Sequence, residues 1–534
     1  MYFKYDKTGK GKVMKKILHI HDKNGPVDKE VTYIPFRFIL AILLIIVETI
    51  AVVLVEVWCA KNIPYFFIAM YAAVAFCLAK IINSEENPEY KIPWLLVVLL
   101  VPVAGFMIYF MFYDRQLSKK YRKRLRQIGR QQIQVDDQMR LEQLKEQDKQ
   151  AYLQANELCQ LSHTHIYQNT DVTYFDMGEK LFSSMIEDLK KAERYIFLEY
   201  FIIEEGHFWN SILEVLKEKA SEGVEVRVIY DDIGCMNTLP GDYYKILRKY
   251  GIMAVPFSKL KGQANNEFNN RNHRKILSID GKVGYTGGVN LADEYINEKE
   301  LFGLWKDVGI RLEGEAVSQL TSFLLSDYEM NVKKPVQSFG PYFERNHSVK
   351  NEGYVVPFVD GPEPIFERRV AKIMIMNMLN QAKDYVYMMS PYLIIDDEMC
   401  QAIENAALRG IDVRIVTPHI PDKKVIFLMT RSHYKRLMDA GVKIYEFEPG
   451  FVHAKVYISD DQYGIVGTIN LDYRSLVHHF ENGVWFYKHE VLHSIKEDVK
   501  RTMERSIPMN EVEIKNTITQ KILRAVIKTV SPML

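Results

Sequence analysis

Cysteine is scarce in this sequence of 534 residues and follows no pattern. The five cysteines are an odd number, and no two of them form a Cys-x-x-Cys pair. This excludes a disulfide framework and gives no sign of a structural zinc site, so a reducing, cytoplasmic catalytic region fits best. An excess of positive charge is also missing, because 69 Lys and Arg stand against 68 Asp and Glu. A protein that follows nucleic-acid backbones normally carries such an excess, so any basic binding surface must be local.

Long apolar runs are concentrated in the first fifth of the chain. They cover residues 36–58, 63–79 and 92–113. Each run approaches the roughly 20 residues that a helix needs to cross a bilayer. Residues 36–113 are therefore predicted to be a transmembrane segment of two or three helices behind a basic tail, residues 1–35. The alternative, buried helices of a soluble protein, would have to explain three such runs in succession.

The charges around these runs predict their orientation. A basic segment without acidic residues extends from Arg115 to Arg130, and the positive-inside rule places the large C-terminal region that follows it in the cytoplasm. The N-terminal tail is basic too, which requires an even number of crossings. Either the first run does not span, because of Glu48, or the third run re-enters around Pro102 and Gly105. The predicted location is the cell membrane, with several passes.

The segments that flank the catalytic region leave alternatives open. The basic segment is either a stop-transfer signal or a patch that binds anionic lipid. Residues 114–170, which include it, are predicted to be a polar linker helix that separates the catalytic region from the bilayer. The C-terminal segment is residues 506–534, and from Ile514 to Leu534 it interleaves basic side chains with Ile and Val, which fits a helix at the membrane surface or an ordinary closing helix.

Beyond residue 170 the sequence repeats itself. Each copy has the same order of short β-branched segments and helical segments before a histidine, His273 in the first copy and His453 in the second. Such alternation predicts βαβ units with a mostly parallel sheet covered by helices on both faces. The predicted fold class is α/β, with two pseudo-symmetric sandwich halves, residues 171–345 and 346–505. The copies differ by one polar loop, residues 261–272, which is either a surface rim or a disordered insertion.

Both copies carry a His-x-Lys-x4-Asp motif. The motif residues are His273, Lys275 and Asp280 in the first copy and His453, Lys455 and Asp460 in the second. Histidine and lysine two positions apart on a strand point to the same face. A neutral imidazole can attack phosphorus, an imidazolium can protonate a leaving alkoxide, and the lysine can stabilise charge on phosphoryl oxygens. The aspartate either orients a motif histidine or is an ordinary turn residue.

A glycine and an asparagine follow each motif at matching distances. They are Gly287 and Asn290 in the first copy and Gly467 and Asn470 in the second. Glycine permits a close backbone approach and asparagine offers an amide donor, so Asn290 and Asn470 are predicted to bind the substrate phosphate. One His-x-Lys pair alone is weak evidence. Two copies in register predict one shared active site.

These motifs resemble those of the phospholipase D superfamily, and the whole layout is similar to that of bacterial cardiolipin synthases. The resemblance extends to residues 287–295, 305–307 and 467–475. It implies a two-step mechanism without metal or other cofactor, in which one histidine takes the phosphatidyl group as a phosphohistidine and the other protonates the departing glycerol. A second phosphatidylglycerol then accepts the group and gives cardiolipin. The resemblance makes His273 the expected nucleophile and His453 the expected general acid/base.

Other functions use the same features. A phospholipase D could pass the phosphatidyl group to water or to another alcohol, and a membrane scaffold could keep the fold without catalysis. The expected partners are phosphatidylglycerol and anionic membrane lipid, without nucleic acid. The sequence does not predict an oligomeric state.

Overall fold

The computed structural model describes most of the chain as two compact units. The described residues are 61–112 except 64, 119–259, 270–332, 334–343 and 349–512, with residues 15–22 and 25–32 and single positions between 43 and 59. One unit holds residues 1–84, 94–113 and 261–265, and the other holds residues 85–93, 114–260 and 266–534. The predicted loop before His273 lies largely outside the described residues, as does the predicted C-terminal helix beyond residue 512.

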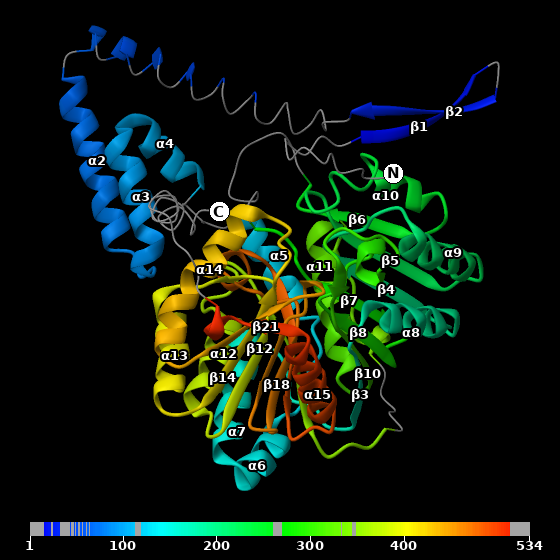
Figure 1. Cartoon of the computed structure of the whole chain (residues 1–534). Helices are drawn as coiled ribbons and strands as arrows, with labels where there is room; N and C mark the ends of the chain where they lie inside the picture. Colours follow the sequence, from blue (N-terminus) through cyan, green and yellow to red (C-terminus); the bar gives the residue numbers. More distant parts are fainter. Residues whose placement is uncertain are drawn as a thin grey trace. The chain divides into compact units, whose positions relative to one another are not determined.

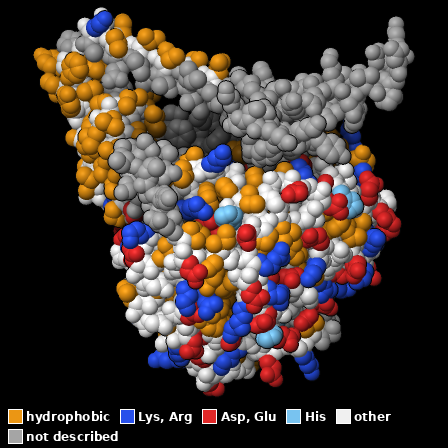
Figure 2. Space-filling model, viewed as in Figure 1, with side chains coloured by type: hydrophobic (Ala, Val, Ile, Leu, Met, Phe, Trp, Pro, Cys, Tyr) orange, Lys and Arg blue, Asp and Glu red, His pale blue; other side chains and the backbone are white. Residues whose placement is uncertain are grey.

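The N-terminal unit contains a hairpin and short apolar helices (Figure 1). The hairpin consists of antiparallel strands β1 (Lys15–Asp22) and β2 (Gly25–Thr32). The helices are α2 (Phe66–Ile82), α3 (Pro88–Leu100), of which residues from 94 on belong to this unit, and α4 (Pro102–Phe112). Figure 2 shows hydrophobic side chains gathered on this unit. Many of them are exposed, among them Phe67, Ile68, Tyr71, Phe76, Leu99, Leu100 and Met107.

The apolar run 92–113, for which the sequence left open a single crossing or a re-entry around Pro102 and Gly105, forms two helices. Proline lacks an amide hydrogen and favours the first position of a helix, and α4 begins at Pro102. The chain then folds back on α3, since a Cβ on Gly105 would lie 2.4 Å from the carbonyl oxygen of Val97. The run 36–58 lies largely outside the described residues. Among the helices that are described, none combines the length and the apolar character that crossing a membrane requires.

The larger unit is built on two sheets with the same topology (Figure 1). In spatial order the first sheet contains β3 (Thr170–Phe175), β10 (Gly309–Gly314), β8 (Val283–Gly287), β7 (Lys275–Ile279), β4 (Tyr195–Tyr200), β5 (Glu225–Asp231) and β6 (Met253–Phe257). The second contains β11 (Tyr354–Asp360), β20 (Glu481–Tyr487), β18 (Tyr463–Gly467), β17 (Val456–Ser459), β12 (Tyr385–Met389), β14 (Asp412–Pro418), β15 (Lys443–Phe447) and β21 (Ser506–Pro508). The first seven strands correspond one to one, so the repeat is a structural duplication.

The prediction of a mostly parallel sheet is wrong. Only β4–β5–β6 and β12–β14–β15 pair in parallel, and the other neighbours within these two sheets pair antiparallel. The parallel strands are those joined by crossover helices, as the alternating pattern indicated. The motif strands β7 and β17 instead return through tight turns into β8 and β18. The result is a mixed α/β fold.

Helices cover the sheets of both halves. They are α8 (Gly178–Lys190), α9 (His207–Ser221), α10 (Tyr243–Arg248) and α11 (Val317–Asn331) in the first half, and α12 (Val370–Gln381), α13 (Asp397–Leu408), α14 (Lys424–Asp439) and α15 (Val491–Glu504) in the second. One buried cluster contains side chains of both sheets, including Phe197 and Ile310 of the first and Val456 and Phe486 of the second. The two halves therefore share a core, which fixes their motifs relative to each other.

The single linker helix expected over residues 114–170 is replaced by three helices of the larger unit. They are α5 (Lys119–Gly129), α6 (Gln138–Gln147) and α7 (Lys149–Ser162). Helix α7 buries Ala151, Ala155 and Leu158 in the core of the second half. The Arg124 guanidinium of α5 donates hydrogen bonds to the backbone carbonyl and carboxylate of Glu329. The composition of this segment is mostly polar, but it contains a small apolar stripe. Through this stripe the segment packs against the rest of the larger unit.

Candidate active site

Backbone hydrogen bonds attach each motif histidine to the opposite half of the molecule. The amide of His273 donates to the carbonyl of Phe480 over 2.9 Å, and the amide of His453 donates to the carbonyl of Lys306 over 2.7 Å. Strand β16 (Gly450–Val452), which leads into the second motif, also pairs in parallel with β9 (Leu304–Lys306) of the first half. The two motifs, separated by 180 positions, therefore meet at the junction of the halves.

A carboxylate from the opposite half orients His273. Its Nδ1 lies 2.9 and 3.0 Å from the two carboxylate oxygens of Glu481, the first residue of β20. The Thr468 hydroxyl donates to the same carboxylate. A carboxylate can only accept, so Nδ1 carries the hydrogen and the Nε2 lone pair is left free. That tautomer suits a nucleophile.

The second histidine has a matching partner. His453 Nδ1 lies 2.6 Å from Asp307 Oδ2, and the Lys455 ammonium lies 2.9 Å from the same nitrogen. A Cβ on Gly288 would come within 2.1 Å of Asp307 Oδ1. The absence of a side chain at Gly288 therefore lets the Asp307 carboxylate lie close to the backbone and contact His453.

The site is buried, and burial perturbs its ionisation. Both motif lysines are at most 1 % exposed, and the two motif histidines are 6 % and 8 % exposed. Burial lowers the pKa of His273 to about 3 and that of His453 below its ordinary value, so both imidazoles are neutral at neutral pH. Burial would raise the pKa of Glu481, but its contact with His273 holds that pKa below its ordinary value. The free site thus contains neutral bases beside charged carboxylates.

The two lysines lie between the motifs. The ammonium group of Lys275 donates to the carbonyl of His273 over 2.6 Å. Burial, opposed by the Glu481 carboxylate and assisted by the charge of Lys455, lowers the pKa of Lys275 to about 7. Burial likewise lowers the pKa of Lys455 to about 8. The charge of Lys275 also lowers the pKa of His453, so the two motifs interact electrostatically. A bound phosphate anion would stabilise the charged form of both lysines.

The motif aspartates do not contact the histidines. The carboxylate of Asp280 accepts hydrogen bonds from the amides of residues 193–195 at 2.8 to 2.9 Å. Asp460 makes the same bonds to the amides of residues 383–385. Both aspartates have a positive φ, near 55°, in the turn that follows the motif strand. The expectation that the aspartates orient a motif histidine is therefore wrong. Their geometry agrees with the alternative, in which they are ordinary turn residues.

The predicted phosphate-binding asparagines are also buried, at 1 % and 5 % exposure. Asn290 accepts from the amide of Ile202 and donates one amide hydrogen to the Tyr295 hydroxyl. Asn470 donates to Asp472. Each uses one amide hydrogen in these bonds, so within the described part of the chain the second hydrogen can serve a phosphate, and their binding of phosphate stays a prediction.

Asp307 and Glu481 are the functional residues that motif reading missed. The sequence contains a faint signal for them, since each copy has an acidic residue near the strand that follows the asparagine. That signal does not show which histidine each carboxylate would contact, because both contacts cross between the halves.

Among the residues that the structure describes, one group of side chains satisfies the spacing for a metal ion. Donor atoms of His273, His479 and Glu481 lie within 4.8 Å of one another. His273 and Glu481 already hydrogen-bond to each other, and the adjoining Lys275 charge opposes a second cation. The hydrogen-bonded pair accounts for the close spacing of these donors.

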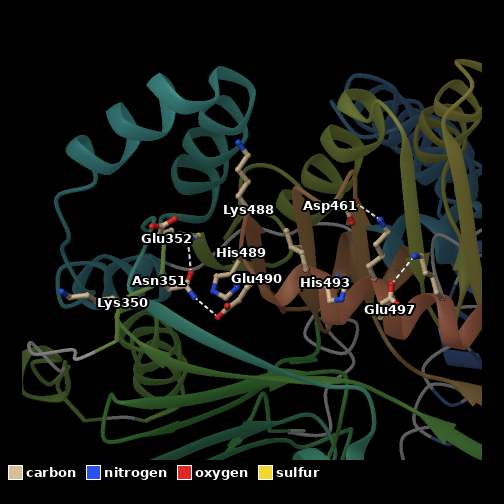
Figure 3. Close-up of a pocket in the computed structure, with 13 residues that line it drawn as sticks. Lys350, Asn351, Glu352, Asp461, Lys488, His489, Glu490, His493 and Glu497 are labelled. Carbon is tan, nitrogen blue, oxygen red and sulfur yellow. Dashed lines mark hydrogen bonds and ion pairs between the residues drawn. The ribbon is translucent and has the colours of Figure 1, made fainter.

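A separate pocket of about 800 Å³ lies at the other end of β20 (Figure 3). It is lined by residues such as Asn351, Asp461, Lys488, His489 and Lys496. Its basic and acidic side chains largely pair with each other, for example Lys496 with Asp461 at 2.7 Å. Strand β20 separates this pocket from Glu481 by roughly 20 Å, at about 3.3 Å per residue. It is not the site of the motif chemistry.

Comparison with known proteins adds independent information. The family described as "Cardiolipin synthase, PLD-like domain" matches residues 185–319 and 375–503, one segment in each half. The family described as phospholipase D-nuclease N-terminal matches residues 72–112.

Similar whole chains carry the same description. A cardiolipin synthase of Alkalihalophilus pseudofirmus is 33 % identical over 467 residues, which are 86 % of this chain and 92 % of that protein. One from Halalkalibacterium halodurans is 31 % identical over 482 residues, which are 89 % of this chain and 95 % of that protein. The crystal structure of a phosphatidylserine synthase from Haemophilus influenzae superposes with a TM-score of 0.55 at 16 % identity, covering 72 % of this chain and 100 % of that one. That likeness concerns the fold alone.

Proposed function

Since the chain belongs to the cardiolipin synthase family of phospholipase D-like proteins, we propose that it transfers the phosphatidyl group of one phosphatidylglycerol to another, giving cardiolipin and glycerol. The observation that carries this proposal is the duplicated site, in which each half supplies a histidine, a lysine and the carboxylate that binds the other half's histidine. Two histidines of this kind suit a reaction in two steps.

In the first step, His273 Nε2 attacks the phosphorus of phosphatidylglycerol. The bond between phosphorus and the glycerol oxygen breaks, and His453, which is neutral in the free site and is proposed to take up a proton from solvent when the anionic substrate binds, gives that oxygen its proton. The phosphorylated imidazole of His273 carries positive charge, which the Glu481 carboxylate stabilises through Nδ1–H. Lys275 and Lys455 are proposed to hold the phosphoryl oxygens, together with the amides of Asn290 and Asn470.

In the second step, His453 is neutral and accepts the hydroxyl proton of a second phosphatidylglycerol. The hydroxyl oxygen attacks phosphorus, the phosphorus–nitrogen bond breaks, and cardiolipin leaves. The division of roles is supported by the different surroundings of the two Nδ1 atoms. His273 Nδ1 faces only carboxylate oxygens, whereas His453 Nδ1 faces both a carboxylate and the Lys455 ammonium. The tautomer required of a nucleophile is therefore better defined in His273.

We also propose that the protein is attached to the cell membrane through its N-terminal apolar region, with the catalytic unit in the cytoplasm. The exposed side chains of α2 support attachment, among them Phe67 at 55 %, Ile68 at 68 % and Phe76 at 62 %. Apolar surface of this extent is normally covered by lipid or by another protein. Whether the region spans the bilayer, and how often, stays a prediction of the sequence.

The experiment that tests the proposed function uses the full chain in membrane vesicles that contain phosphatidylglycerol. Cardiolipin and free glycerol should appear in equal amounts, and neither should form with His273→Ala. Phosphatidic acid without cardiolipin would mean that water is the acceptor. Cardiolipin formation without release of glycerol would also contradict the proposed reaction.

A further inference from the structure

A third histidine, His479, lies against His273 and has no role in the two steps proposed above. It is 7 % exposed. Within the described part of the chain, neither of its ring nitrogens makes a hydrogen bond. Its Nδ1 is 3.7 Å from a Glu481 oxygen, which is longer than a hydrogen bond. Burying polar atoms without partners costs about 1–3 kcal/mol each, so such atoms usually face a ligand or water in the working molecule.

The internal repeat shows what occupies the equivalent position in the other half. His479 stands two residues before Glu481, as Trp305 stands two residues before Asp307. The ring centroids of His479 and His273 are 5.5 Å apart at an interplanar angle of 43°. Those of Trp305 and His453 are also 5.5 Å apart at 43°. Each motif histidine thus has against it the ring of the residue two positions before the carboxylate that it contacts.

The two rings differ in their surroundings. Trp305 packs against the rings of Tyr295 and Phe451, each at 4.9 Å, besides His453. The indole therefore belongs to an aromatic wall. His479 has only His273 and, at 6.4 Å, Phe201 as ring neighbours within the described residues. Among the described residues both rings carry polar atoms without a hydrogen-bond partner, Nε1 of Trp305 and both ring nitrogens of His479, but the indole lies within a cluster of aromatic rings.

The backbone before His479 holds this ring in place. Residues Arg474–His478 form a π-helical turn, a feature often found at functional sites. The His479 amide closes that turn by donating to the carbonyl of Arg474 over 2.8 Å. The ring is therefore fixed beside His273 by the turn and by β20, and it does not depend on a side-chain hydrogen bond for its position.

We propose that His479 is a further substrate-binding residue, whose imidazole N–H donates a hydrogen bond to a phosphoryl oxygen of the phosphodiester at His273. This inference rests on the proposed function for the identity of the phosphodiester. An anionic phosphate is the expected ligand because the ring lies against His273, whose motif lysine Lys275 supplies positive charge. The equivalent Trp305 differs in its packing, because its indole lies among other aromatic rings, whereas the His479 imidazole lies against His273 and has two ring nitrogens without a hydrogen-bond partner among the described residues.

The test measures binding of inorganic phosphate to the full chain in detergent micelles by calorimetry, with a chelator present throughout. His479→Phe removes the donor and keeps a ring, and His479→Gln keeps an amide N–H. A hydrogen bond to a charged group predicts phosphate binding weaker by roughly 10- to 100-fold in His479→Phe and largely restored in His479→Gln. His433→Asn replaces a buried histidine of α14 outside the site and should bind phosphate like the unmodified protein.

Turnover separates the two proposals. If the unmodified protein makes cardiolipin and His479→Phe binds phosphate as tightly as it does, the role of His479 is refuted and the proposed function stands. If the unmodified protein makes no cardiolipin but His479→Phe weakens phosphate binding as expected, the proposed function fails and the role of His479 stands. Equal weakening in His479→Phe and His479→Gln would indicate a structural effect and would overturn the inference.

Discussion

The substitution Glu481→Gln tests the carboxylate that the opposite half supplies to His273. Glutamine has nearly the same size, so the change removes the charge and keeps the packing. Glu481 is fully buried, and its oxygens lie 2.9 and 3.0 Å from His273 Nδ1. Water therefore cannot replace the lost charge. The phosphorylated imidazole, which is positively charged, should be destabilised more than the free imidazole.

The magnitude follows from one charge-assisted hydrogen bond. Such a bond contributes about 1.5–3 kcal/mol, and each 1.4 kcal/mol corresponds to a tenfold change in rate. We expect kcat/KM for phosphatidylglycerol to fall by roughly 10- to 100-fold. A larger loss, up to about 10⁴, would follow if the glutamine amide donates to Nδ1 and reverses the tautomer, as in an Asp→Asn variant of a serine protease triad.

The assay is release of glycerol from phosphatidylglycerol by the reconstituted full chain. The matched control is Glu446→Gln, since Glu446 is equally buried and its carboxylate lies 2.9 Å from His419 Nδ1, away from the motifs. This control should lower the free energy of unfolding while the folded fraction keeps its kcat. A Glu481→Gln variant with unchanged kcat/KM and unchanged stability would refute the role assigned to the carboxylate.

Four further outcomes are expected. Burial lowers the pKa of Lys275 to about 7, so the charge of this lysine in the free protein is lost as pH rises through that value. We therefore expect kcat/KM, measured from pH 6 to 9, to fall on the alkaline side. A flat profile would contradict this. Asp280→Ala should lower the free energy of unfolding, measured by denaturant titration, by about 2 kcal/mol, because three backbone amides lose their acceptor. The kcat of the folded protein should not change. A large loss of kcat would mean that Asp280 has a catalytic role. Gly288→Ala should reduce glycerol release, because its Cβ would displace Asp307 from His453; full activity would show that this contact is dispensable. Asp307→Asn should reduce glycerol release by roughly 10-fold or more, since it removes the charge beside His453; normal rates would exclude that carboxylate from the mechanism.

The sequence predicted the site where the repeat and local periodicity were sufficient. The sequence placed each histidine and its lysine on a strand, but only Lys275 lies in one, at the start of β7; His273, His453 and Lys455 come just before the motif strands. The matched register from His273 and His453 through the asparagines reflects two sheets whose strands correspond one to one. The antiparallel strand pairs were not predicted. The crossover helices dominate the sequence pattern, whereas the two strands of each motif hairpin are joined by only a short, tight turn.

The partners of the histidines could not be predicted from the sequence. Glu481 lies 208 positions from His273, and Asp307 lies 146 positions from His453. These contacts depend on how the two sheets pack across their shared core. The motif aspartates were misjudged for a related reason, because the positive φ at Asp280 turns its carboxylate toward the amides that precede β4. Spacing alone does not encode that direction.

The most direct test of the account is the chemical identity of the covalent intermediate. His453→Ala removes both the acid that protonates the departing glycerol and the base that activates the second phosphatidylglycerol. The intermediate should therefore form more slowly than in the unmodified protein but should not be consumed, so it should accumulate during a long incubation. Mass spectrometry of the full chain after incubation with phosphatidylglycerol should then find the phosphatidyl group on His273. An adduct on another residue, or cardiolipin formation by His273→Ala, would contradict the central claim that the two motifs form one site with His273 as its nucleophile.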